Sequence, residues 1–280
     1  MAAKAAFGVS LGVLVFGSGL GARFTDITAL LRRPGLLVRS LIAVLVVAPV
    51  LAVVLVRVFD LNQEVAIALV ALSVSPLPPL LPSRGEKAGG RTEYGLGLVL
   101  LLAVCGVPFI MVSTEALQAV FGRDYISAPW TIAKLLILTM VVPLVAGMVL
   151  ARFSPLTARR LEGPIERVQR WLLPIAMVVL LISAAPDMWS LLGNHTLLAL
   201  GIFVLGSFAA GHLLGGPDRR DAAVLAFATS CRHPATALAL ASANFPDTEE
   251  HAAVALYGLM TAAVGAVYTL WLRRHRAKAG

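Results

Sequence analysis

Long apolar runs, separated by short charged segments, follow one another along almost the whole chain. Nine such runs hold about 17–23 residues each, the length at which an α-helix crosses the hydrocarbon core of a bilayer. The runs are continuously apolar and do not alternate, which favours membrane-spanning helices over the strands of a closed barrel. The predicted spans are residues 5–22, 36–58, 64–82, 93–114, 129–151, 171–190, 195–214, 222–243 and 251–272.

The composition agrees with a chain that lies almost wholly in a membrane. Of 280 residues, 59% are hydrophobic and 14% charged, whereas soluble domains average about 45–50% and about 25%. These values exclude a soluble globular protein and a disordered chain. The two cysteines, Cys105 and Cys231, lie in apolar runs and support neither a disulfide framework nor a metal site. We predict an all-α polytopic membrane protein with about nine transmembrane helices in one membrane domain, residues 1–280, without a cofactor.

The net charge of +8 comes from lysines and arginines that gather in every second loop. Eighteen of them lie in the first, third, fifth and seventh loops and in the C-terminal tail, against three on the opposite side. Because cytoplasmic loops collect these residues, we predict a cytoplasmic C-terminus, an external N-terminus and a place in the inner (plasma) membrane. The lipid bilayer thereby accounts for the basic charge without a nucleic-acid partner. The oligomeric state does not follow from the sequence.

Residues 152–170 form a loop that carries several charges of both signs. We interpret it as a cytoplasmic amphipathic linker. It would join a first half, residues 1–151 with spans one to five, to a second half, residues 171–280 with spans six to nine. A solvated connector is the plain interpretation of this segment, and a lipid-binding role is the alternative.

The third run contains four prolines within seven residues, at positions 76, 78, 79 and 82. They cannot form a regular helix, because each lacks an amide donor and clashes with the preceding turn. Irregular backbone at membrane depth must be buried in protein or line a wet cavity. In the alternative interpretation the span ends near Ser75 and the later prolines lie in a loop. That would leave only about 12 residues, too few to cross.

The eighth run carries Arg232 near its middle, followed by His233 and Pro234. A charge at this depth costs at least about 2.5–3.5 kcal/mol, and an arginine cannot release its proton. No acidic residue lies well inside a predicted span to pair with it. Arg232 is therefore either an anion site beside a broken helix or a tether for the carbonyls that the proline-rich third run leaves free. The two roles are compatible. His233 could relay protons, although a core histidine with satisfied hydrogen bonds is the simpler interpretation.

The two broken runs occupy corresponding places in the chain, each after two spans and before one further span. This arrangement indicates an inverted-repeat secondary transporter whose binding site lies where the two breaks cross. The candidate binding residues are the charged and hydroxyl-bearing residues of both breaks, namely Arg232, His233, Ser230, Thr229, Thr236, Ser73 and Ser75. The helix-breaking residues are Pro76, Pro78, Pro79, Pro82 and Pro234.

Several stretches, in this order, resemble the bile acid:sodium symporter family and its bacterial relatives. The resemblance covers most of the chain and implies a plan of two inverted five-helix repeats with the first helix missing. The matching features are a glycine-rich opening span, a basic turn, a proline in the following span, a first proline break with its Lys-Gly turn, and a second break. They are Phe16–Leu20 with Thr25 and Asp26, Arg32–Pro34, Pro49, Ser75–Pro76 with Lys87–Gly90, and Thr229–Pro234 with Ala237–Ala239.

The departures from this pattern concern the sodium ligands that the resemblance implies. The positions of the family's carboxylate and amide ligands are nearly all changed, and these positions are Ala228, Arg232, His233, Leu81, Pro82 and either Val44 or Val46. Hard cations require oxygen ligands, and Arg232 places a fixed positive charge where the resemblance would place an ion. We therefore expect a sodium-independent relative in which Arg232 takes the place of the cation.

The resulting hypothesis is a secondary transporter of a small organic anion. One alternative is a sodium-coupled symporter with rearranged ligands, and another is a degenerate, non-transporting membrane scaffold or sensor. An enzyme is not expected. Ser230, Cys231 and His233 are sequence neighbours in a broken helix, without a third group deep in a span to orient the histidine as a base.

Overall fold

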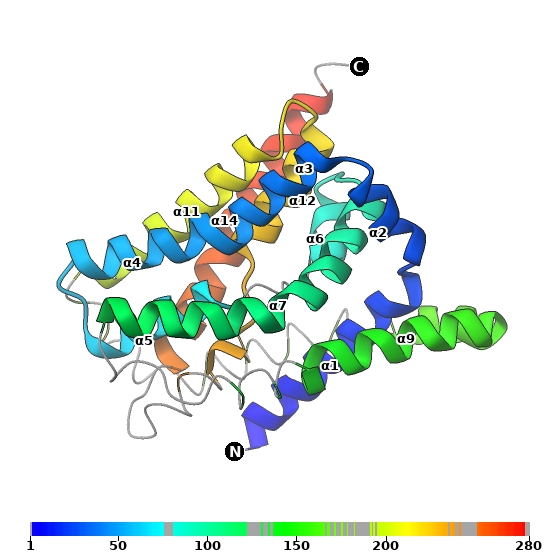
Figure 1. Ribbon diagram of the computed structural model, residues 1–280, viewed down its shortest axis with the longest axis horizontal. Coiled ribbons are helices and arrows are strands. Elements are labelled where there is room, and N and C mark those ends of the chain that lie inside the picture. Colours follow the sequence, from blue (N-terminus) through cyan, green and yellow to red (C-terminus); the bar gives the residue numbers. More distant parts are fainter. Residues whose placement is uncertain are drawn as a thin grey trace.

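The computed structural model describes residues 2–75, 81–121, 137–165, 195–234, 236–238 and 251–277, with isolated positions between these ranges. Within the described part the chain is helical and contains no strand, as the apolar pattern predicts (Figure 1). The elements are α1 (Ala2–Gly21), α2 (Phe24–Leu31), α3 (Pro34–Leu41), the π-helix η1 (Ile42–Val47), α4 (Ala48–Val58), α5 (Gln63–Ser73), α6 (Leu81–Lys87), α7 (Thr92–Phe121), the π-helix η3 (Ile137–Val141), α9 (Val142–Phe153), α11 (Thr196–Leu214), α12 (Arg219–Ser230) and α14 (His251–Ala277).

Among the described residues, four helices are long and apolar enough to cross a membrane. A fifth span results if the helical stretches Gly12–Gly21 and Thr25–Leu31, which bend by 80° at their junction, count as one. Gln63–Ser73 and Ile137–Phe153 are apolar but shorter. The polytopic all-α class is thereby confirmed, whereas the number nine stays a prediction. Most of the predicted sixth span, 171–190, lies outside the described residues. The four long spans are Pro34–Val58, Thr92–Ser113, Thr196–Leu214 and His251–His275.

Two of the helices contain a π-helical segment, each placed two residues before a proline. Pro49 follows η1 at this distance, and Pro143 follows η3. A proline inside a helix has no amide hydrogen and repels the carbonyl one turn earlier, so the backbone widens locally to accommodate it. The helices continue through these prolines, and some carbonyls in the preceding turn lose their donors.

Close backbone contacts at glycines hold two helix pairs together. A Cβ atom on Gly19 of α1 would lie 2.3 Å from the Leu144 carbonyl oxygen of α9, and one on Gly147 would lie 2.4 Å from the Phe16 carbonyl oxygen. Gly211 of α11 approaches the Leu225 carbonyl oxygen of α12 in the same way, at 2.5 Å. Small residues let membrane helices approach this closely. In Figure 1, α1 and α9 form one pair below α7, and α11 lies in the larger group of helices above it.

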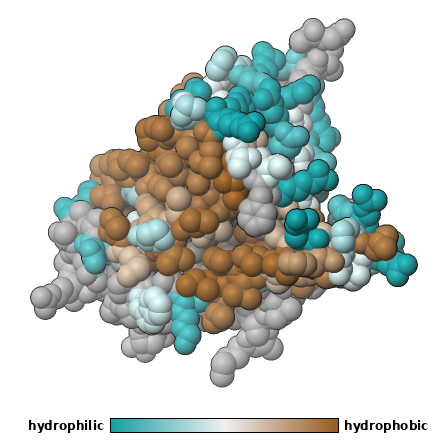
Figure 2. Space-filling view, turned by 45° about the vertical axis from the view of Figure 1, so that its right-hand side comes forward, coloured by the Kyte–Doolittle hydropathy of each residue, from teal (hydrophilic) through white to brown (hydrophobic). Residues whose placement is uncertain are grey.

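The outer surface of the bundle is apolar, as a lipid-facing surface must be. Along η1 and α4, every fourth residue is an exposed valine, with exposed fractions from 48% to 69% at Val46, Val50, Val54 and Val58. This spacing places the four side chains on one helix face. Figure 2 shows a broad apolar surface bounded by hydrophilic residues at the upper end of the molecule. We infer that this surface lies in the hydrocarbon core.

Four of the five basic segments that alternate along the sequence meet at one end of the molecule. Arg33 forms an ion pair of 2.6 Å with Asp221, and Arg91 pairs with Asp218. The Asp221 carboxylate accepts a hydrogen bond from Arg33 and thereby raises the pKa of that guanidinium. Arg273, near the C-terminus, donates to the Lys87 carbonyl oxygen at 2.9 Å. The first, third and seventh loops and the tail thus share one face, opposite the N-terminus (Figure 1). That this face is cytoplasmic, and that residues 152–170 divide two halves, stay predictions.

Candidate functional site

The eighth run is interrupted where the sequence carries Arg232. Helix α12 begins with Asp218 as its cap, whose side chain accepts from the Arg220 amide at 2.8 Å, and it ends at Ser230. Cys231, Arg232 and His233 are not helical, and helical residues resume at Pro234. A proline clashes with the carbonyl four residues earlier, which here is that of Ser230, and it keeps the residue before it out of the helical conformation. The sequence therefore ends α12 where the structure shows its end.

Pro234 opens the second helical stretch, because the first position of a helix needs no amide donor. The His233 side chain caps this start, its Nδ1 atom accepting from the Thr236 amide at 3.0 Å and lying 2.9 Å from the Thr236 hydroxyl. An amide nitrogen can only donate, so Nδ1 is an acceptor and the ring proton lies on Nε2. His233 is fully buried, and its Nε2 atom has no hydrogen-bond partner in the described part of the chain.

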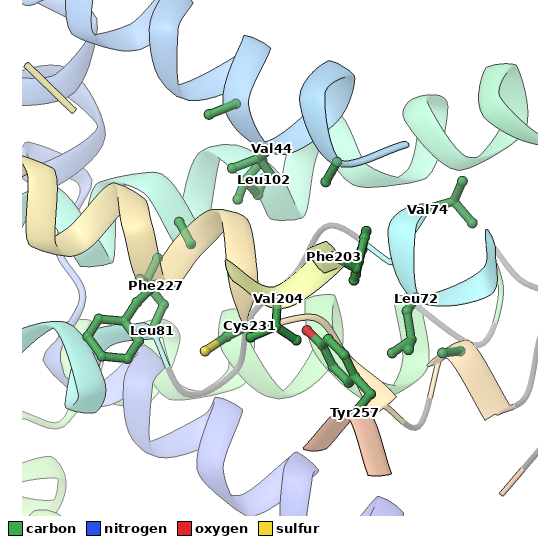
Figure 3. Close-up of a cluster of buried hydrophobic side chains, with 14 of the residues drawn as sticks. Val44, Leu72, Val74, Leu81, Leu102, Phe203, Val204, Phe227, Cys231 and Tyr257 are labelled. Atoms are coloured by element: carbon green, nitrogen blue, oxygen red, sulfur yellow. The ribbon is translucent and has the colours of Figure 1, made fainter. Parts of the chain in front are cut away.

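Tyr257 of α14 connects the two sides of the interruption. Its hydroxyl donates to the Ser230 carbonyl oxygen, which Pro234 leaves without a helical donor. The same hydroxyl oxygen accepts from the Arg232 amide at 2.9 Å. Tyr257 is 1% exposed. Figure 3 shows its hydroxyl oxygen directed toward the segment that carries Cys231, with Val44 on the helix above. One phenol thus satisfies two backbone groups that the break would otherwise leave unpaired.

Arg232 is 3% exposed, and its Nη2 atom donates to the Val44 carbonyl oxygen at 3.0 Å. Val44 lies in the π-helical segment, where a carbonyl bonds to the amide five residues later. That position is Pro49, which has no amide hydrogen. Arg232 is thus bonded to a carbonyl of the second predicted span, whereas the tether predicted from the sequence was to carbonyls that the proline-rich third run leaves free. Of the two valines that the resemblance leaves open, Val44 is buried at the site, whereas Val46 is 51% exposed.

The Nε and Nη1 donors of Arg232 have no acceptor among the residues that the structure describes. Its Nε and Nη1 atoms are buried without hydrogen-bond partners, and no carboxylate in the described ranges forms an ion pair with it. A buried donor without a partner costs about 1–3 kcal/mol, and more when it is charged. Together with Nε2 of His233, two successive residues present unpaired N–H groups in the interior. Such a group of donors favours binding of an anion.

Four of the five predicted hydroxyl residues use their donors on nearby backbone carbonyls. Each of the four donates to a carbonyl three or four residues earlier, at 2.7–2.8 Å, as serines and threonines often do near helix ends. This holds for Ser73, Ser75, Thr229 and Ser230, while the hydroxyl of Thr236 lies beside His233. The structure places all five in buried positions. Their hydroxyl protons are not directed at a ligand, which leaves Arg232 and His233 as the donors of the site.

The described helix that follows the first proline-rich run, α6, lies against α12. Helix α5 ends at Ser73, and Pro76, Pro78 and Pro79 lie outside the described residues. Pro82 is the second residue of α6 and so lies in the first turn of a helix, where no amide donor is needed. Helix α6 packs against α12, and a Cβ atom on Gly85 would meet the Val224 side chain at 3.6 Å. Arg84 of α6 donates to the Cys231 thiol at 3.4 Å.

Three residues that contact α12 or the interruption after it are absent from the candidates predicted from the sequence: Tyr257, Arg84 and Gly211. Tyr257 could have been noticed, because a tyrosine in the middle of an apolar span needs a partner for its hydroxyl. Gly211 and Gly215 form a small-xxx-small pattern, which marks close helix contacts in membranes. Arg84 gives no such signal, since its sequence position is that of an ordinary basic loop residue.

The charged side chains described at the break are positive. No group of three or more His, Cys, Asp or Glu side chains that could hold a metal occurs in the part of the chain that the structure describes. At the position where the resemblance implies a carboxylate, Ala228 is fully buried in α12. The charged side chains at the break are the guanidinium groups of Arg232 and, through Cys231, of Arg84. Sodium would meet positive charge here without carboxylate ligands.

Comparison with known proteins identifies the family. The model of the sodium bile acid symporter family matches residues 9–210, more than half of the chain. No curated protein matches the chain. The match extends from α1 through most of α11 and ends before α12, so the interruption that carries Arg232 lies outside it. The matched length confirms the resemblance that the sequence motifs indicate. The chain belongs to the sodium bile acid symporter family and is a membrane-embedded protein of this transporter type.

Proposed function

We propose that the protein is a sodium-independent secondary transporter of a small organic anion, which it binds at the interruption after α12. The observation that carries this proposal is the buried guanidinium of Arg232, which has two unpaired nitrogens and no carboxylate partner in the described residues. A buried charge of this kind requires a counter-ion, and a transported anion would supply it.

The contacts of Arg232 support a fixed binding group. One N–H is held by the Val44 carbonyl, and the backbone amide is held by Tyr257. These bonds limit the rotation of the side chain, so that its free edge is presented in one orientation. A guanidinium binds a carboxylate, sulfonate or sulfate with two parallel hydrogen bonds, and His233 Nε2 adds a third donor on the neighbouring residue.

The fixed positive charge of Arg232 is the reason to expect transport without sodium. In a sodium symporter the cation would neutralise part of the charge of the anionic substrate, and here the guanidinium would do so permanently. Because the charge is covalently fixed, substrate binding would need no external cation. Alternating access would then follow from movement of one helix group against the other, with the interruption at its middle.

Uptake into liposomes that contain the purified protein tests this proposal. The probes are radiolabelled organic anions, including a bile acid, each compared with an uncharged analogue, in sodium, potassium and choline chloride. We expect saturable uptake of at least one anion at equal rates in the three salts. Arg232→Gln should lower that uptake at least a hundredfold, because it removes a buried charge–charge contact.

Arg220→Gln is the matched control, since Arg220 is an exposed arginine at the other end of α12. It should leave uptake within twofold of the native protein. Uptake that requires sodium would show a sodium-coupled symporter with rearranged ligands and refute sodium independence. Uptake that survives Arg232→Gln would refute the binding site.

A further inference from the structure

A cavity of about 380 Å³ lies where the carboxyl-terminal end of α1 meets α9 and the helical residues 155–165. Its volume is within the range of small-molecule sites, about 300–1,000 Å³. The charged side chains at its walls are those of Arg23, Arg152, Arg159 and Glu162. Three positive groups and one negative group leave two positive charges in excess. The cavity is separate from the interruption after α12, and neither the family match nor the proposed transport reaction assigns a ligand to it.

Three helical elements form the walls of the cavity. Gly19 and Gly147 bring α1 and α9 into backbone contact, which fixes the two helices relative to each other. Helix α9 then ends at Phe153, and a new helical stretch begins at Pro155. The residues of this stretch that line the cavity are Pro155, Ala158, Arg159 and Glu162. Their spacing of three and four residues places them on one helix face, so this face closes the cavity over the end of α1.

The surroundings of the cavity are those of a membrane surface. It lies at the ends of two apolar helices, on the side that the distribution of lysine and arginine predicts to be cytoplasmic. Two large apolar side chains beside it are almost fully exposed, Phe153 at 81% and Leu156 at 75%. Figure 2 shows hydrophilic residues gathered around an apolar patch at the right-hand tip, the end to which α9 runs in Figure 1. Exposed aromatic and aliphatic groups next to arginines are typical of segments that insert among lipid headgroups.

We propose that this cavity binds the phosphate of an anionic phospholipid from the cytoplasmic leaflet. Three arginines line a space large enough for a headgroup, and a guanidinium binds phosphate oxygens through paired hydrogen bonds. Basic pockets between membrane helices bind anionic headgroups in this way. The exposed Phe153 and Leu156 side chains would contact the acyl chains of the same lipid, which favours a lipid over a free phosphate ion. The linker at residues 152–170 would then be a lipid-binding element as well as a connector.

Native mass spectrometry of the delipidated full-length protein tests the proposal. The probe is phosphatidylglycerol, with phosphatidylcholine as the zwitterionic comparison and inorganic phosphate as the soluble one. We expect one phosphatidylglycerol molecule to be retained more tightly than the others. Arg152→Gln and Arg159→Gln should each weaken this binding about fivefold, since each basic residue near an anionic surface contributes about 1 kcal/mol. Arg159→Lys keeps the charge but lacks the planar guanidinium, and its affinity for phosphatidylglycerol should lie between those of the native protein and Arg159→Gln.

The matched control is Arg160→Gln, which removes an exposed arginine adjacent to Arg159 that does not line the cavity. It should bind phosphatidylglycerol like the native protein. The proposal is overturned if Arg160→Gln weakens binding as much as Arg159→Gln, or if phosphatidylcholine binds equally well. If inorganic phosphate binds as tightly as phosphatidylglycerol and displaces it, the ligand is a free phosphate, and the proposal of a bound phospholipid is refuted. Equal melting temperatures without lipid would show that the variants are folded.

Discussion

The arginines at the two ends of α12 differ in their burial and in their partners. At the first end, Arg33 and Arg91 are about half exposed and are neutralised by Asp221 and Asp218. At the other end, Arg232 is buried, bonds a single side-chain N–H to a backbone carbonyl, and has no carboxylate partner within the described ranges. Where the fold needs a structural tie between loops, it uses an ion pair. At the buried end no such pair occurs among the described residues, and we propose that a bound anion supplies the counter-ion.

Replacing Gly211 should disturb both ends of this helix at once. A Cβ atom on Gly211 would meet the Leu225 carbonyl at 2.5 Å and the Ala226 Cα at 2.6 Å, so α11 and α12 must separate. Gly211→Ala should destabilise the protein by about 3 kcal/mol or more, because backbone atoms cannot yield as side chains do. Thermal unfolding in detergent measures this loss. Gly201→Ala on the same helix is the control. It would make only an ordinary contact of 3.5 Å with Met260, and it should be neutral or slightly stabilising.

Removing a carboxylate should affect only the ion-paired end. Asp221 is 1% exposed, and Asp221→Asn should cost about 2 kcal/mol, since it leaves Arg33 without its partner while Arg33 stays partly in water. Asp218→Asn, at an exposed pair, should cost less than about 1 kcal/mol. Urea unfolding of both variants gives the comparison. A loss of anion uptake in Asp221→Asn at unchanged stability would contradict a purely structural role for this end.

Removing the phenol hydroxyl should affect the buried end. Tyr257→Phe leaves the Ser230 carbonyl and the Arg232 amide unpaired and should cost about 1–2 kcal/mol. It should also weaken anion uptake, because Arg232 is then held less firmly. Tyr94→Phe is the matched control, since this tyrosine is also buried and bonds to Ser40 away from the interruption. It should lower stability to a similar degree and leave the Michaelis constant for the anion unchanged.

The smallest effect is expected at the hydroxyl residues. Ser73 donates to the Val70 carbonyl of its own helix, which also accepts from the Val74 amide at 3.2 Å. Ser73→Ala should therefore change stability by less than about 0.5 kcal/mol and leave uptake within twofold. A tenfold loss of uptake at normal stability would show that this hydroxyl contacts the substrate after all.

The sequence predicts the helical class and the position of the interruption for identifiable reasons. Apolar runs of crossing length specify helices in a membrane, and Pro234 must disturb the turn that precedes it. The burial of Arg232 follows from its place in the middle of a run. These are local properties, and each can be read from neighbouring residues without knowledge of the fold.

Contacts between distant segments could not be predicted in the same way. Val44 offers its carbonyl to Arg232 because Pro49 removes a donor, yet nothing in the sequence indicates that these two residues, 188 positions apart, are paired. Tyr257 and Arg84 are similar cases, since each acts on the interruption from another helix. The hydroxyl residues were selected for their chemistry, and only the helix geometry shows that their donors are already in use.

The most direct measurement of the central claim is the melting temperature of the purified protein in sodium, potassium and choline chloride at equal ionic strength. A cation that binds only the folded state would stabilise it by about 2.7 kcal/mol at a hundredfold excess over its Kd. With Arg232 in the place of the cation, we predict the same melting temperature in all three salts. A rise of several degrees that is specific to sodium would contradict the account.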